Sequence, residues 1–265
     1  MTAAAVKQNL YSVKMAAYKP QMASNSSTTR TRTRNVAKKV APARSGRKKS
    51  APRTAATSEA APYHHGALHG ALLEAAERVL ERDGLAGLTL RAVAREAGVS
   101  HAAPTHHFGD LTGLVSELAA VGYRQFGAAM TAAAAAGTSL TEKAMARAKA
   151  YVTYAQAHPG MYGLMFRAER LDMKRPSLHE AAKASFAGLA GAIGASRHEQ
   201  ISEEALSVDQ AAAIVRAWSL LHGFTMLLLD DRLSDVLRRI PKGTDVETLL
   251  EAMLKSTVGR PPEPY

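Results

Sequence analysis

The stretch at residues 88–108, LTLRAVAREAGVSHAAPTHHF, restricts the fold most strongly, because its pattern predicts two short helices joined by a tight turn. Thr89 can cap the first helix with its hydroxyl, Gly98 can adopt the left-handed backbone that ends it, and Ser100 is the predicted cap of the second. The apolar residues of the first helix recur at the spacing of one helix face: Leu90, Val93, Ala94 and Ala97. Together these elements indicate a helix-turn-helix DNA-binding motif.

The composition indicates an all-helical protein. Hydrophobic residues make up 46% of the 265, many of them the strong helix formers Ala and Leu, and no run alternates strictly between apolar and polar residues as a half-buried strand does. The chain has no cysteine, which excludes disulfides, thiolate zinc sites and cysteine nucleophiles and gives no sign of secretion. We therefore expect a cytoplasmic all-α protein that is associated with the nucleoid because it binds DNA.

The basic charge of the chain is concentrated at its N-terminus. Thirteen of the 34 Lys and Arg residues, and no Asp or Glu, lie in residues 1–58, which leaves 21 basic and 23 acidic side chains elsewhere. We predict that residues 1–60 form a disordered basic tail, since they hold too few large apolar residues to offset the entropy of ordering. The tail is either an arm that grips DNA phosphates or a dispensable segment, such as an upstream extension if translation starts at Met15 or Met22.

The rest of the chain is helical by its hydrophobic periodicity and its helix breakers. The predicted helices lie near residues 68–82, 110–137, 139–158, 161–170, 176–195, 208–229 and 245–258. Gly84 ends the first of them, Asp110 or Thr112 opens the second, and Pro159 separates the third from the fourth. The helix at 110–137 is long enough to act as a lever between the DNA-binding motif and the helices that follow.

The segment at 208–229 is the most apolar of these helices, and residues 211–229 have the length of a membrane span. Arg216 and His222 lie within it, and polar or charged residues inside a bilayer are costly. A helix that is apolar on all sides in a soluble protein packs both in its own core and against a second subunit. We therefore predict a subunit interface at this helix and no membrane span.

These features together resemble the TetR family of bacterial transcription regulators. The resemblance is strongest over residues 63–126, which contain the start YHHG, the sequence TLRAVAREAGVS, a recognition segment that ends in His107-Phe108, and a helix that begins one or two residues later. AWSLLHG at 217–223 is similar to the subgroup whose ligand domain carries a Trp-x-x-x-His-Gly signature. Residues 1–60 have no counterpart in the resemblance.

The resemblance implies a homodimeric regulator that binds a palindromic operator in double-stranded DNA. Each subunit would have a three-helix DNA-binding domain at 61–109 and a helical ligand-binding and dimerisation domain at 110–258, followed by a frayed end at 259–265. The helices at 208–229 and 245–258 would form a four-helix dimer interface. A small apolar effector inside the ligand domain would relieve repression, and we expect no cofactor.

The recognition segment departs from the family at Pro104 and Thr105, where relatives commonly have Leu-Tyr and the tyrosine contacts a phosphate. Pro104 disfavours ordinary helical pairing, so we predict that the regular helix begins at Ala103 or Pro104, with His107 and Phe108 pointing inward. The residues predicted to contact DNA lie in or near this segment and before the first helix: Thr89, Arg91, Ser100, His101, Ala102, Thr105, His106, His64 and His65.

A set of apolar side chains with a few polar groups is typical of a ligand pocket. The residues predicted to line one are Tyr162, Met165, Phe166, Trp218, His222 and Met226. Trp218 and His222 are four residues apart and share a helix face. The alternative is that the set belongs to the core of a helical bundle.

A metal site and an enzyme active site are both disfavoured. His64 and His65 lack identifiable third and fourth ligands, and no nucleophile or acid–base pair is recognisable, so we predict that the chain is not an enzyme. The main alternative to a regulator is a nucleoid-type DNA-coating protein, which would act mainly through the basic tail and would bind DNA without sequence preference.

Overall fold

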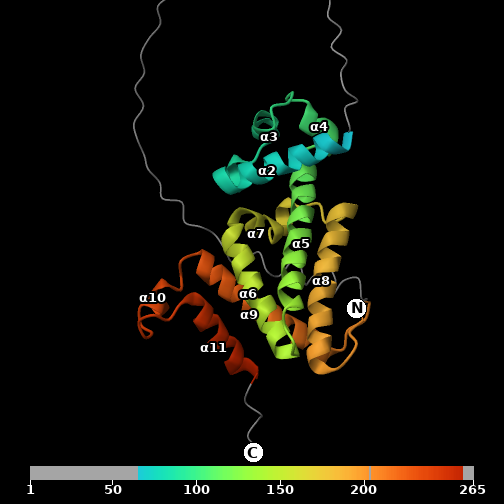
Figure 1. Ribbon diagram of the computed structural model, residues 1–265. Helices are drawn as coiled ribbons and strands as arrows, with labels where there is room; N and C mark the ends of the chain where they lie inside the picture. Colours follow the sequence, from blue (N-terminus) through green and yellow to red (C-terminus); the bar gives the residue numbers. More distant parts are fainter. Residues whose placement is uncertain (1–64, 203, 259–265) are drawn as a thin grey trace, which may run out of the picture. The chain divides into compact units, whose positions relative to one another are not determined.

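The computed structural model describes residues 65–202 and 204–258, and every regular element within these ranges is a helix (Figure 1). The predicted all-α fold is therefore confirmed. The predicted tail at 1–60 and the predicted frayed end at 259–265 lie outside the described residues.

The helix-turn-helix motif is built from α2 (His65–Gly87), α3 (Leu90–Glu96) and α4 (Ala103–Phe108). Thr89 caps α3 as predicted, because its hydroxyl accepts a hydrogen bond from the N–H of Ala92 at 3.1 Å. Gly98 has a φ of 68°, the left-handed backbone predicted for the turn. The first helix starts earlier than the predicted 68–82, and Gly84 interrupts its regular backbone.

The prediction that Ser100 caps the second helix of the motif is wrong. Ala102 occupies the cap position without a side-chain hydrogen bond, and Pro104 lies in the first turn of α4. A proline is tolerated in a first turn because the N–H that it lacks would have no helical partner there. The turn closes through the backbone instead, since the Ser100 carbonyl accepts from the N–H of Ala103 at 3.0 Å.

A long helix, α5 (Leu111–Ala135), leads from this motif into the remaining helices (Figure 1). Asp110 caps it by accepting a hydrogen bond from the N–H of Gly113 at 2.8 Å. Leu114 and Leu118 are fully buried on α5, which packs mainly against α6 (Leu140–Ala157) and α8 (Pro176–Arg197). The burial of its apolar stripe fixes the motif to the C-terminal helices.

The other elements are α7 (Pro159–Met165), the short 3-10 helix η1 (Ala168–Arg170), α9 (Val208–Leu229), α10 (Ser234–Leu237) and α11 (Val246–Val258). The helix predicted at 161–170 is thus two elements, because regular α-helix ends at Met165. The short α10 was not predicted, since four residues are too few to show a helical period. The bounds of α9 are those predicted from its apolar pattern.

Two apolar clusters form the interior of the described part. The larger one contains side chains of α2, α3, α4, α5, α6, α7 and α8. The smaller one joins α6, α9 and α11 through Val152, Phe224 and Leu250. The apolar face of α11, which was predicted to meet a second subunit, packs partly on this smaller cluster.

The helix α9 is buried on one side only. Its outer side leaves large apolar side chains exposed, with Val208 at 85%, Val215 at 55% and Leu227 at 47%. In the part of the chain that the structure describes, α9 is also the helix that is long and apolar enough to cross a membrane by length and composition. Core helices of soluble proteins can have the same length and composition. The exposed apolar side therefore says more about the surroundings of α9 than its length does.

We expect Gly113→Ala to destabilise the protein, because the added Cβ would lie 2.0 Å from the carbonyl oxygen of Phe108. The free energy of unfolding should fall by about 1–3 kcal/mol, the usual cost of overpacking, in urea denaturation followed by circular dichroism. Gly127→Ala on the same helix is the control, since no atom lies within 4 Å of its added Cβ, and it should gain up to about 1 kcal/mol from helix propensity. Equal stability of the two variants would contradict the predicted clash.

Candidate DNA-binding surface and effector site

The outer side of α4 and the turn before it carry short polar or small side chains. His101, Ala102, Thr105 and His106 are exposed, whereas Pro104 and Phe108 are buried. The spacing of the exposed residues places them on one side of the short helix. The central residues of the predicted DNA contact set are therefore accessible together, on a support that the buried residues hold in place.

The arginines around the motif fall into two groups. Glu96 accepts hydrogen bonds from Arg82 Nη1 at 2.9 Å and Arg78 Nε at 3.0 Å, and these bonds hold the pKa of Glu96 below its usual value. They tie α2 to α3. Arg91 and Arg95 are exposed on α3 and offer charge for phosphate contacts.

The other predicted DNA contacts have different surroundings. Thr89 is exposed, and its hydroxyl accepts the capping bond of α3 while its proton remains able to donate. Ser100 is exposed in the turn. His64 lies outside the described residues, and His65 is the first residue of α2 with a side chain that is not described.

The inner side of α4 rests on a cluster of rings that includes a histidine of α2. The ring centres of His69 and Phe108 are 4.9 Å apart, and those of His69 and His107 are 6.0 Å apart. Phe108 is buried and His107 is half-buried, so the prediction that both point inward is confirmed. Sequence reasoning missed His69, which stood out only as a polar residue within an apolar helix pattern.

A second cluster of side chains joins α6, α7 and α9. The hydroxyl of Tyr162 lies 2.8 Å from Nδ1 of His222 and 3.0 Å from the hydroxyl of Tyr151. The ring of Phe166 lies 4.7 Å from that of His222 and 6.4 Å from that of Trp218. The structure thus brings together four of the six residues predicted to bind an effector. We call these four and Tyr151 the aromatic cluster.

The two predicted methionines lie apart from the hydrogen-bonded centre of this cluster. Met165 is buried and faces α5, where its sulfur would be 2.9 Å from a Cβ added at Gly122. Met226 is 38% exposed on α9. Tyr151 was missed by sequence reasoning, because it sits in a helix separated from His222 by 71 residues and no local pattern links the two.

Burial keeps the two hydroxyls of the aromatic cluster protonated. It raises the pKa of Tyr151 to about 12, although hydrogen bonding with the Tyr162 and Trp218 side chains partly opposes the effect. Burial also raises the pKa of Tyr162, and the neighbouring Tyr151 adds to the rise. Both tyrosines are therefore neutral near neutral pH, and their hydroxyls are engaged in the hydrogen bonds of the cluster.

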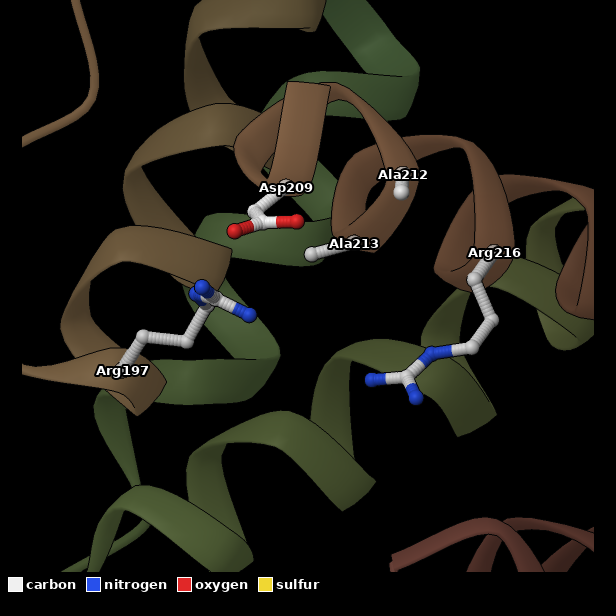
Figure 2. Close-up of a pocket in the computed structure, with 5 residues that line it drawn as sticks. All are labelled: Arg197, Asp209, Ala212, Ala213 and Arg216. Carbon is white, nitrogen blue, oxygen red and sulfur yellow. The ribbon is translucent and has the colours of Figure 1, made fainter. Parts of the chain in front are cut away.

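Two surface hollows lie elsewhere. One of about 240 Å³ is lined by Arg197, Asp209, Ala212, Ala213 and Arg216, and Figure 2 shows the arginine side chains reaching it from α8 and α9. Arg197 already forms an ion pair with Glu199, so its charge is compensated. The other, of about 400 Å³, is lined by Leu85, Leu88, Leu111, Thr112, Val115, Glu169 and Arg170. Neither contains a residue of the aromatic cluster. No group of side chains suited to a metal ion occurs within the described ranges.

We expect Tyr162→Phe to cost more stability than Tyr151→Phe. Removal of the Tyr162 hydroxyl leaves both Nδ1 of His222 and the Tyr151 hydroxyl without this partner, whereas removal of the Tyr151 hydroxyl leaves the bond between Tyr162 and His222 intact. The first variant should lose about 1–2 kcal/mol of unfolding free energy and the second about 1 kcal/mol or less, measured by urea denaturation. The reverse order would show that Tyr151 is the centre of the network.

Comparison with protein families gives two matches. Residues 72–118 match the family described as bacterial regulatory proteins, tetR family, and residues 144–257 match the tetracyclin repressor-like C-terminal domain. No curated protein matches the chain.

Solved structures share the fold. A protein of unknown function from Rhodococcus sp. RHA1 is 32% identical, with a TM-score of 0.60 over 74% of this chain and 95% of that one. A protein assigned as a TetR family transcription regulator from Shewanella sp. PV-4 is 18% identical, with a TM-score of 0.52 over 72% and 97%. The fatty acid degradation regulator FadR from Bacillus halodurans is 13% identical, with a TM-score of 0.54 over 72% and 98%. The two family matches cover both the helix-turn-helix motif and the C-terminal helices, and they show that this chain belongs to the TetR family of DNA-binding transcriptional regulators.

Proposed function

We propose that this regulator is a homodimeric repressor which a small apolar effector releases from a palindromic operator in the cytoplasm. The observation that carries the proposal is the exposed set at 101, 102, 105 and 106, which is presented by α4 on a buried support. The comparisons give no support to the alternative of a DNA-coating protein. The protein acts by binding rather than by catalysis.

The exposed side of α9 supports the homodimer. Val208, Val215 and Leu227 offer an apolar surface that a second copy of α9 would cover, and such unpaired apolar surfaces mark subunit contacts. The apolar face of α11 is already partly used inside the subunit. We therefore assign α9 the main part of the interface and α11 a smaller part than the sequence predicted.

The aromatic cluster supports the effector site. It combines large apolar rings with the hydroxyls of Tyr151 and Tyr162, and with a histidine, within hydrogen-bond distance of one another. Trp218 and Phe166 lie at its outer edge and are partly exposed. An apolar molecule with one hydrogen-bond acceptor fits this chemistry, and we assign the Trp-x-x-x-His-Gly signature to this site.

We expect His101→Ala and Thr105→Ala each to weaken operator binding by about tenfold, since a lost base or phosphate contact costs on the order of 1–3 kcal/mol. The operator is first selected from random duplexes with the full chain, and affinities are then measured by fluorescence anisotropy. His179→Ala and Thr153→Ala, exposed residues of the same types on α8 and α6, are the controls. Unchanged affinity in both test variants would contradict the assigned surface.

Deletion of residues 1–58 separates the regulator from a DNA-coating protein. The deletion removes thirteen basic residues, so overall affinity and its salt dependence should fall. The ratio between operator and random duplex affinity should be preserved, because α4 remains. A truncated protein with no sequence preference would overturn the proposed function.

We expect Val215→Glu to dissociate the dimer, because it places a charge in the proposed apolar interface. Val236→Glu is the matched control, since Val236 is 45% exposed on α10, outside α9. Sedimentation should show a monomer for the first variant and a dimer for the second, with unchanged helical circular dichroism in both. A dimer that survives Val215→Glu would exclude the exposed side of α9 as the interface.

A further inference from the structure

The side chain of Glu81 on α2 holds the start of α7. Its Oε1 accepts a hydrogen bond from the N–H of Met161 at 2.9 Å, and its Oε2 accepts from the N–H of Gly160 at 3.0 Å. The first N–H groups of a helix have no partner within the helix, and a carboxylate is a strong acceptor for them. A helix of the DNA-binding motif thus caps a helix that is about 80 residues away in the chain.

The residue next to this contact belongs to the aromatic cluster. Tyr162 directly follows Met161 on α7 and its hydroxyl meets Nδ1 of His222 on α9 at 2.8 Å. The N–H of Tyr162 donates to the His158 carbonyl at 2.8 Å, so a helical hydrogen bond holds this first turn of α7. Displacement of the Tyr162 side chain by an effector would therefore also displace the two N–H groups that Glu81 binds.

The other end of α7 has a separate attachment. The hydroxyl of Tyr123 on α5 donates to the Met165 carbonyl at 2.8 Å. These two attachments connect α7 to α2, a helix of the motif, and to α5, the helix that follows the motif. Only the α2 attachment is made by residues adjacent to Tyr162, and only Glu81 contributes a charged group.

We infer that Glu81 couples the aromatic cluster to the DNA-binding motif, so that displacement of α7 by an effector repositions α2 and lowers operator affinity. This inference rests on the proposed function, because it specifies how the effector site of that repressor is connected to its operator site. Coupling between two sites is reciprocal. Operator binding must therefore alter the surroundings of the aromatic cluster, and this can be measured without knowing the effector.

The chain supplies its own probe for the test. Trp218 is the single tryptophan among the 265 residues and lies beside Phe166 at the edge of the aromatic cluster. Tryptophan fluorescence therefore comes from this one position, and the state of the dimer has to be kept the same in every comparison. Glu81→Gln keeps the size of the side chain but leaves one acceptor oxygen in place of two, and Glu74→Gln, at an exposed position of the same helix, is the matched control.

The first measurement uses the full chain without DNA. In Glu81→Gln the amide protons of residues 160 and 161 should exchange at least about fivefold faster, the effect of losing one hydrogen bond of about 1 kcal/mol. Acrylamide quenching of Trp218 should change in the same variant, and Glu74→Gln should match the wild type in both. Faster exchange with unchanged Trp218 quenching would overturn the inference, since the contact would then be local to α7.

The second measurement adds the selected operator at a protein concentration that keeps the dimer. The wild type and Glu74→Gln should show a change in Trp218 emission that saturates with operator binding, whereas Glu81→Gln should bind operator and lose at least about half of that change. Loss of the change in Tyr123→Phe but not in Glu81→Gln would overturn the inference in favour of the α5 attachment. If selection yields no operator, the proposed function fails, and the measurement without DNA still decides whether Glu81 and the cluster are connected.

Discussion

The continuous apolar core along α5 is the constraint on which the rest of the structure depends. Leu72 of α2, Leu118 of α5, Tyr162 of α7 and Leu178 of α8 all belong to one buried cluster. Side chains from both sides of the domain boundary predicted at 109/110 therefore pack in one shared core. Because packed interiors transmit displacement instead of absorbing it, the DNA-binding helices cannot reorient without an adjustment among the helices that carry the aromatic cluster.

Polar contacts at the edge of this core hold some helices to α5 more firmly than packing alone would. Ser116 and Glu117 of α5 bind the segment before α8: the N–H of Asp172 donates to Ser116 Oγ at 2.8 Å, and Arg175 Nε donates to Glu117 Oε1 at 2.6 Å. Burial alone would raise the pKa of Glu117, but the hydrogen bond from Arg175 and the charge of its guanidinium lower it overall. The carboxylate thus stays charged and fixes the start of α8 to α5.

Features encoded within a few residues could be predicted from the sequence, and features made by distant residues could not. Thr89, Gly98 and Asp110 act within one turn of their own position, so their roles follow from residue type. The bounds of α9 follow from a long apolar pattern. Ala102 and not Ser100 caps α4, because Pro104 places the start of the helix two residues further along, and the start predicted at Ala103 or Pro104 is confirmed. Glu81 could not be found at all, since its partners lie about 80 residues further along the chain.

The same limit applies to the functional sites. Trp218 and His222 could be paired because they share one helix face, but their polar partner Tyr151 lies on α6 and follows from no pattern. Likewise, the sequence marked α9 as apolar on all sides, yet only the structure shows which side its own subunit leaves open at Val208 and Val215.

The chemistry of α4 limits how the proposed DNA-binding surface can discriminate between DNA sequences. The helix has six residues, of which Pro104 and Phe108 are buried, and none of its exposed side chains can form the bidentate contact by which Arg or Lys reads a guanine. Arg78 and Arg82 are held by Glu96, and the exposed Arg91 and Arg95 lie on α3 rather than on α4. In the proposed homodimer, each half-site would therefore contribute only a modest energy of base readout. A second copy of α4 at a fixed spacing would multiply this small preference, so the proposed interface on α9 would determine sequence specificity as much as the recognition helix itself.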